Sequence, residues 1–116
     1  MNLQKSQQHG FTILSLQGQI GSLKDSIALK SEINSLLEER TPKIALCLKD
    51  LEYVDSAALN VLIYARNQIE KYQGLLCLLE PNEYIMDMIS VVGLRNVFTI
   101  CMDRDSLKTV THTPLP

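Results

Sequence analysis

The chain has no apolar run long enough to cross a membrane: no stretch approaches the roughly 20 residues that a spanning helix needs. It also has no cluster of five or more basic residues, and its net charge is −2. The lack of a basic cluster and the negative net charge argue against an anionic membrane surface or a nucleic acid as the main partner. The first residues, Met1 to His9, are too polar for a signal peptide, so we expect a cytoplasmic protein.

Motifs of nucleotide-binding and hydrolytic enzymes are absent as well. The chain contains no G-x-G-x-x-G, no P-loop and no G-x-S-x-G. No histidine stands in motif relation to a serine or a cysteine, so a hydrolytic triad would have no general base. The adjacent carboxylates Glu38 and Glu39 fall at the end of an expected helix, where such pairs are normally solvated. We therefore interpret the chain as a binding component without a cofactor, not as an enzyme.

The cysteines and histidines predict neither a disulfide framework nor a metal site. Cys47, Cys77 and Cys101 are odd in number, form no Cys-x-x-Cys pair, and each lies within an aliphatic run. Such cysteines are typically buried, reduced and space-filling. His9 and His112 stand near opposite ends of the chain without a partner motif, so we expect no zinc site.

What remains is the pattern of one globular domain, 46% apolar over 116 residues. We place this domain at residues 1–110 and a polar, proline-containing tail at 111–116. Strands are expected at 3–8, 11–16, 44–48, 75–79 and 97–101, and helices at 22–40, 57–72, 82–92 and 103–110. Strands separated by helices are largely parallel. The order therefore predicts an α/β fold with a mixed, mostly parallel sheet of four to five strands and about four helices.

Apolar residues at helical spacing predict which helix faces are buried. The expected stripes are Leu29, Ile33, Leu36 and Leu37; Ala58, Val61, Leu62, Ala65, Ile69 and Tyr72; and Ile85, Met88, Ile89 and Val92. Glycine accepts the left-handed conformation that closes a helix. We therefore expect Gln73-Gly74 to end the second helix, with the glycine left-handed, and Gly93 to end the third, with Leu94 folding back in a Schellman-type contact.

The segment Asp50–Leu59 joins an apolar strand to a helix and places Asp55 and Ser56 at the join. A helix start leaves backbone amides unpaired and carries a partial positive charge. Ser56 can cap such a start, and its hydroxyl is well placed to carry a phosphate. Asp55 is favourable there as an anion, or acts as a second cap. Most serines at such positions are caps only, so both interpretations of Ser56 stay open here.

The order of elements and three short motifs resemble the STAS domain family, whose bacterial members include the anti-sigma factor antagonists. Residues 55–60, Asp-Ser-Ala-Ala-Leu-Asn, stand where that family typically shows Asp-Ser-Ser-Gly-Leu-Gly with the first serine phosphorylated. Residues 18–20, Gly-Gln-Ile, look like the family's Gly-x-Leu-Asp loop. Residues 92–94, Val-Gly-Leu, look like its Ser/Thr-Gly-Leu helix end. The resemblance runs from about residue 11 to residue 110.

The resemblance implies an anti-sigma factor antagonist that acts by protein–protein contact. The unphosphorylated antagonist binds an anti-sigma factor that is also a serine kinase, which frees the sigma factor. Phosphorylation separates the pair, and a serine phosphatase resets it. By this resemblance Ser56 is the phosphoacceptor, supported by Asp55 and Ala57, in a monomer or weak dimer. The docking surface would include Gly18, Gln19, Gly21, Ala58, Asn60 and Tyr64. For Tyr64, partial burial against a neighbouring helix is an equal alternative.

Three departures from the family pattern bear on this switch. Gly21 stands where the family usually has an aspartate near the phosphorylation site. Ala57 replaces the second serine, which leaves Ser56 as the only hydroxyl in the motif. Ala58 and Asn60 replace two glycines and add side chains where a partner could otherwise approach closely.

Two other function classes remain open at this stage. The first alternative is a STAS subunit of a lipid or anion transport complex, or of a stress-signalling scaffold, in which Ser56 is merely a cap. The second is a small-ligand or nucleotide-binding domain, which ranks last because the chain has no phosphate loop.

Overall fold

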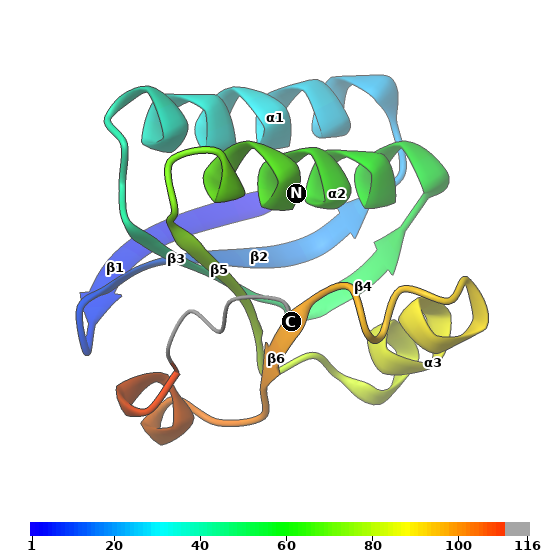
Figure 1. The fold of residues 1–116 in the computed structure, drawn as a ribbon. Helices are drawn as coiled ribbons and strands as arrows, with labels where there is room; N and C mark the ends of the chain where they lie inside the picture. The colour runs from blue at the N-terminus through cyan, green and yellow to red at the C-terminus, as the bar shows by residue number, and fades with distance from the viewer. Residues whose placement is uncertain (111–116) are drawn as a thin grey trace.

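A computed structural model describes residues 1–110 and shows an α/β fold built on one mixed six-stranded sheet (Figure 1). The strand order is β1-β2-β3-β5-β6, and β4 pairs with β2 outside this path. β1 runs antiparallel to β2, and every other pairing is parallel. The strands are β1 (Asn2–Gln8), β2 (Phe11–Ile20), β3 (Lys43–Cys47), β4 (Leu51–Val54), β5 (Leu75–Leu79) and β6 (Thr99–Cys101).

The helices among the described residues are α1 (Leu23–Glu38), α2 (Ser56–Glu70) and α3 (Glu83–Val91), followed by a 3-10 turn at Asp105–Lys108. The predicted fold class is confirmed. There are six strands, however, where four to five were expected, and three α-helices plus a 3-10 turn where about four helices were expected. The expected tail, residues 111–116, lies outside the described residues.

β4 is the strand that the sequence pattern did not predict. It has only four residues, and its two central side chains, Glu52 and Tyr53, are exposed. It pairs with the last part of β2, which continues to Ile20, four residues beyond the end of the strand predicted at 11–16. The pairing shifts between Gly18 and Gln19, where Gly18 adopts a φ of 89° that favours glycine. A glycine bulge therefore lets β2 pair with β4 in addition to β1 and β3.

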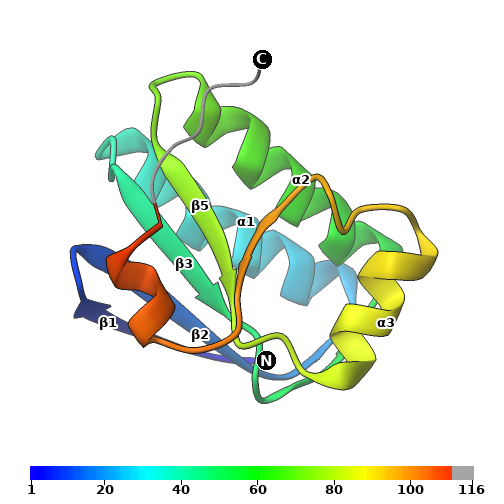
Figure 2. The same cartoon turned by 60° about the horizontal axis from the view of Figure 1, so that its bottom comes forward.

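The two faces of the sheet carry different cores. α1 and α2 lie side by side over one face, where alternate residues of β2 such as Leu14 and Leu16 join the main core (Figures 1 and 2). The intervening residues, Phe11 and Ile13, point into a smaller cluster together with Leu107 of the 3-10 turn. This arrangement follows from the period of two along a strand.

Most residues of the predicted helix stripes are buried, but Leu37, Tyr72 and Met88 are only partly buried and one residue is exposed. Leu29, Ile33 and Leu36 of α1 face the main core, as do Ala58, Val61, Leu62, Ala65 and Ile69 of α2. Val92, predicted to continue the stripe of α3, is instead 51% exposed. The helix ends at Val91, and Val92 has a non-helical ψ of 4°, so its side chain leaves the buried face.

All three α-helices end in a Schellman-type turn, although the left-handed residue is glycine in only one. For α3 the prediction is confirmed: Gly93 has a φ of 78°, and the Leu94 amide donates to the Ile89 carbonyl at 2.9 Å. After α2 the prediction is wrong, because the left-handed residue is Gln73, with a φ of 64°. Gly74 is needed for space instead: a Cβ there would lie 2.6 Å from Cγ1 of Ile69.

The three cysteines are buried free thiols, as predicted, and all lie in the smaller cluster. Burial raises the pKa of the Cys77 thiol strongly, and the neighbouring Cys101 raises it further. Burial also raises the pKa of Cys101. Both thiols therefore stay protonated and unreactive at neutral pH.

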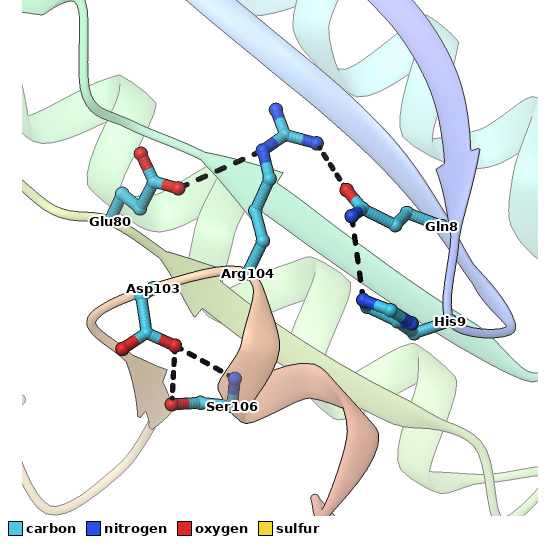
Figure 3. Close-up of polar contacts among 6 residues, drawn as sticks. All are labelled: Gln8, His9, Glu80, Asp103, Arg104 and Ser106. Carbon is cyan, nitrogen blue, oxygen red and sulfur yellow. Dashed lines mark hydrogen bonds and ion pairs between the residues drawn. The ribbon is translucent and has the colours of Figure 1, made fainter.

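Polar contacts attach the C-terminal segment to the face of the sheet that lacks α1 and α2 (Figure 3). Arg104 Nη1 donates to Gln8 Oε1 of β1 at 3.0 Å, and its Nε lies 3.7 Å from Glu80 Oε1. Asp103 accepts hydrogen bonds from the backbone and hydroxyl of Ser106, and these bonds lower the pKa of its carboxyl. The 3-10 turn is thereby fixed over the smaller cluster, away from α1 and α2.

Candidate functional site

The site is the junction at which β4 ends and α2 begins. Val54 pairs with Ile20 of β2, and the Asp55 amide donates to the Ile20 carbonyl at 2.9 Å. Because Gly21 follows Ile20 directly, the segment between β2 and α1 lies beside the start of α2. The predicted contributors Gly18, Gln19 and Gly21 are therefore brought to the same end of the molecule as Ser56.

Of the two caps that the sequence offered for α2, Asp55 and not Ser56 is the one used. Asp55 has extended backbone angles, and its Oδ1 accepts a hydrogen bond from the Ala58 amide at 2.9 Å. Ser56 is the first helical residue. Aspartate and serine are nearly equal as N-caps, so two adjacent candidates cannot be ranked from sequence alone.

This correction changes the chemistry available to Ser56. Its side chain is exposed, and within residues 1–110 its hydroxyl forms no hydrogen bond to another protein group. It stands over the first turn of a 15-residue helix, where unpaired amides and the helix dipole favour an anion. The serine is thus free to be modified without loss of the helix cap.

Removing the carboxylate should therefore cost stability, whereas removing the hydroxyl should not. Asp55→Ala is expected to lower the free energy of unfolding by about 1 kcal/mol, because the Ala58 amide loses its acceptor. Urea denaturation monitored by circular dichroism would measure this. Glu52→Ala, at an exposed carboxylate of β4, is the matched control and should change stability little. A loss confined to Ser56→Ala would instead identify the serine as the cap.

The other predicted site residues are only partly on the surface. Ala57 and Asn60 are exposed, in the first two turns of α2. Ala58 is 0% exposed and belongs to the main core, so its predicted place on a docking surface is wrong. The burial follows from its position on the helix face toward the sheet, which the same sequence pattern had indicated.

Tyr64 adopts the second of the two roles considered for it. It is half-buried, its hydroxyl donates to Asn34 Oδ1 of α1, and Lys30 Nζ lies 4.6 Å from its ring centroid. Tyr64 therefore joins α2 to α1, two turns along the helix from Ser56. A structural role explains its position.

Sequence reasoning missed three exposed apolar side chains at this end of the molecule: Leu23, Ile27 and Tyr53. Leu23 and Ile27 are four residues apart on α1 and lie off its buried stripe, which is a signal that was available in the sequence. Tyr53 gave no such signal, because its exposure depends on the pairing of β4 with β2.

Two further sequence expectations concern metal binding and membrane-spanning helices. Within residues 1–110, no group of three or more histidines, cysteines, aspartates or glutamates is arranged to hold a metal ion. His112 lies outside the described residues. In the same part of the chain, no helix combines the length and apolar character needed to cross a membrane.

The family model named STAS domain matches residues 2–107 of the chain. BtrV of Bordetella bronchiseptica, a candidate anti-sigma factor antagonist, is 26% identical over 116 residues, which are 100% of this chain and 99% of that protein. The junction at Ser56 thus lies well inside the matched segment.

Solved structures share the fold at low sequence identity. A candidate anti-sigma factor antagonist of Thermotoga maritima has a TM-score of 0.82 at 22% identity, over 90% of this chain and 89% of that one. The Bacillus protein SpoIIAA is known in two forms. Its unphosphorylated form, described as an anti-sigma factor antagonist, gives a TM-score of 0.72 at 14% identity over 94% of this chain and 100% of that one. Its phosphorylated form gives 0.73 at 14% identity, over 95% and 100%.

Proposed function

Because the chain belongs to the STAS domain family, we propose that it is an anti-sigma factor antagonist, switched by phosphorylation of Ser56. In this proposal residues 1–110 form one cytoplasmic binding domain without catalysis of its own. Its partners are an anti-sigma factor with serine kinase activity and a serine phosphatase. The unphosphorylated domain binds the anti-sigma factor and so regulates transcription indirectly.

The observation that carries the proposal is the free hydroxyl of Ser56 at the start of α2. Asp55 supplies the helix cap, so Ser56 can gain a phosphate without destabilising the helix. The added phosphate carries roughly −1.5 to −2 charges and three acceptor oxygens. Amides and the dipole at the helix start would stabilise it, so the domain need not unfold.

The switch would act at the surface where the partner docks. A partner that covers Ser56 must remove water from the new phosphate, beside the carboxylate of Asp55. Burying such charge without a matching cation is costly, so the complex would dissociate. A phosphatase that removes the phosphate would restore the original surface.

Site mapping on the intact protein tests this proposal. We expect incubation with ATP and an anti-sigma factor kinase from the same genome to add a single phosphate, mapped by mass spectrometry to Ser56. Ser56→Ala should remain unmodified, and Ser31→Ala, at an exposed serine of α1, should be modified like the wild type. Absence of phosphate under every condition, including in protein from native cells, would favour a STAS subunit that binds without being switched.

A further inference from the structure

A polar cavity lies on the face of the sheet that lacks α1 and α2, and no residue of the junction at Ser56 lines it. Its volume is about 280 Å³, and its walls come from β1, β2 and β3 and from the segments that follow β3, β5 and β6. Ser15 and Gln17 of β2 point to this face, as Phe11 and Ile13 do, because side chains alternate along a strand. The cavity lies at the carboxyl ends of the parallel strands β3 and β5, where open α/β sheets commonly bind ligands.

The cavity carries charges of both signs in equal number. Lys49 and Arg104 contribute two cations, and Asp50 and Glu80 contribute two carboxylates. Within residues 1–110, the exposed side chains of Lys49 and Asp50 form no hydrogen bond or ion pair with another protein group. One cation and one carboxylate are therefore available to a ligand at adjacent positions of the loop that follows β3.

The second pair of charges, Arg104 and Glu80, is fixed before any ligand binds. Figure 3 shows Arg104 between the two groups that hold it: Gln8 Oε1 accepts from its Nη1 at 3.0 Å, and Glu80 Oε1 lies 3.7 Å from its Nε. The remaining nitrogen of the guanidinium group, Nη2, forms no hydrogen bond with a protein group in the part of the chain that the structure describes. Side chains held in place in this way lose little entropy when they bind a ligand.

The backbone of Glu80 is held in a conformation that residues other than glycine rarely adopt. Its φ is 49°, and its amide donates to the Cys101 carbonyl at 2.7 Å. Three other residues with such angles, His9, Arg40 and Gln73, stand in a hairpin turn or just after a helix, where left-handed residues are expected. Glu80 instead follows the buried strand β5 directly. Residues held in this way are concentrated at ligand and active sites, so this angle supports a binding role for the cavity.

Uncharged polar side chains form the rest of the polar wall. Gln4 of β1 and Ser15 and Gln17 of β2 line the cavity, and their side chains form no hydrogen bond with another protein group within residues 1–110. Gln4 pairs with Ser15 in the antiparallel ladder, so these two side chains lie next to each other on the same face. Two carboxamides and one hydroxyl offer both donors and acceptors. A ligand with neutral polar groups of its own can therefore find partners here.

The lining argues against most other kinds of ligand. A simple anion would meet the carboxylates of Asp50 and Glu80, and a simple cation would meet Lys49 and Arg104. No residue that lines the cavity is aromatic, so neither a nucleobase nor a sugar ring has a side chain on which to stack. The volume is just below the range of roughly 300 to 1,000 Å³ that drug-sized ligands occupy. The ligand should therefore be small and carry charges of both signs.

We propose that this cavity binds a small zwitterion, namely a free amino acid with an uncharged polar side chain. The α-carboxylate of the ligand binds Lys49 and Arg104, and its α-ammonium group binds Asp50 and Glu80, through charge-assisted hydrogen bonds. The uncharged polar groups of β1 and β2 bind the side chain of the ligand. This inference does not depend on the proposed function of Ser56.

Thermal unfolding in the presence of L-serine, L-threonine, L-asparagine or L-glutamine tests the inference. At about 10 mM, at least one of these amino acids is expected to raise the melting temperature by about 4 °C or more, because a ligand that binds only the folded chain stabilises it. Isothermal titration calorimetry with that amino acid should then show one site per chain and give its Kd. A shift below about 1 °C with all of these amino acids would overturn the inference.

Two charge-neutralising variants determine whether the amino acid binds in this cavity. Lys49→Gln and Asp50→Asn are each expected to raise its Kd at least about tenfold, because each removes a charged partner of the ligand. Lys5→Gln on β1 and Asp87→Asn on α3 are the matched controls: both residues are exposed, neither lines the cavity, and both variants should keep the wild-type Kd. Substitutions at exposed positions leave the fold intact. Wild-type affinity in both Lys49→Gln and Asp50→Asn would place the ligand elsewhere and overturn the inference.

Analogues that lack one charge distinguish a zwitterion site from a site for a simple ion. The α-carboxamide of the bound amino acid lacks the carboxylate, and its N-acetyl derivative lacks the ammonium group, so each should bind at least about tenfold more weakly. Equal affinity for either analogue would contradict the inference. If inorganic phosphate binds as tightly as the amino acid and Lys49→Gln weakens its binding, the cavity is an anion site and the inference is wrong. None of these outcomes involves Ser56, so the proposed function is tested separately.

Discussion

Ser56→Asp is expected to weaken binding to the anti-sigma factor kinase about 100-fold, whereas Ser56→Ala keeps the wild-type affinity. The aspartate places a permanent charge next to Asp55 on a surface that the partner must dehydrate, and 100-fold corresponds to about 2.7 kcal/mol. The alanine removes only an exposed hydroxyl that forms no bond within residues 1–110. Calorimetric titration of both variants against the same kinase measures the difference.

A control variant separates the effect of where the new charge lies from the effect of the changed net charge. Ser6→Asp makes the same substitution at an exposed residue of β1, the outermost strand of the sheet, and should bind like the wild type. Circular dichroism should show that all three variants are equally folded, because Asp55 and not Ser56 caps α2. Equal affinity of the wild type and Ser56→Asp would contradict the switch.

Stability is expected to fall as the pH rises above about 8.5, because the buried thiols ionise only after unfolding. Burial raises the pKa values of Cys77 and Cys101 in the folded chain. Above the pKa that a thiol has in the unfolded chain, the unfolded chain binds fewer protons than the folded one. Each further pH unit therefore lowers the free energy of unfolding. The loss approaches about 1.4 kcal/mol per pH unit for each such thiol, and below pH 8 it disappears.

Urea denaturation at pH 7, 8, 9 and 10 would measure this slope. Cys77→Ala should lower stability at every pH because it leaves a cavity, but it should also flatten the alkaline decline. Above pH 10, Tyr72 adds to the decline, since burial raises the pKa of its hydroxyl as well. A wild-type stability that is constant from pH 8 to pH 10 would contradict this account.

Strands and helix faces that are buried along their whole length were predicted correctly from the sequence. The apolar runs at 44–48 and 75–79 became the central strands β3 and β5, and the helical stripes became the face of α1 and α2 toward the sheet. Glycine at 93 was identified because its φ of 78° is a local requirement. These features have one physical cause each, so a single sequence suffices to find them.

The missed features depend on competition between neighbours or on contacts between distant segments. Asp55 and Ser56 are comparable caps, and only the backbone angles of residue 55 decide between them. Gln73 takes the left-handed conformation, while Gly74 leaves the room that the Ile69 side chain occupies. The position of Tyr53 over Gly21 follows from the pairing of β4 with β2, which no short motif encodes.

The bulge at Gly18 has an evolutionary consequence for the site. Ahead of it, β2 belongs to the central ladder of buried strands, where most substitutions would disturb packing on both faces. From Gly18 onward, β2 holds β4 through only three paired residues, and the two middle side chains of β4 face solvent. The exposed surface of β4 can therefore diverge at little cost to stability. Such a division lets one scaffold acquire new partners while its core changes slowly.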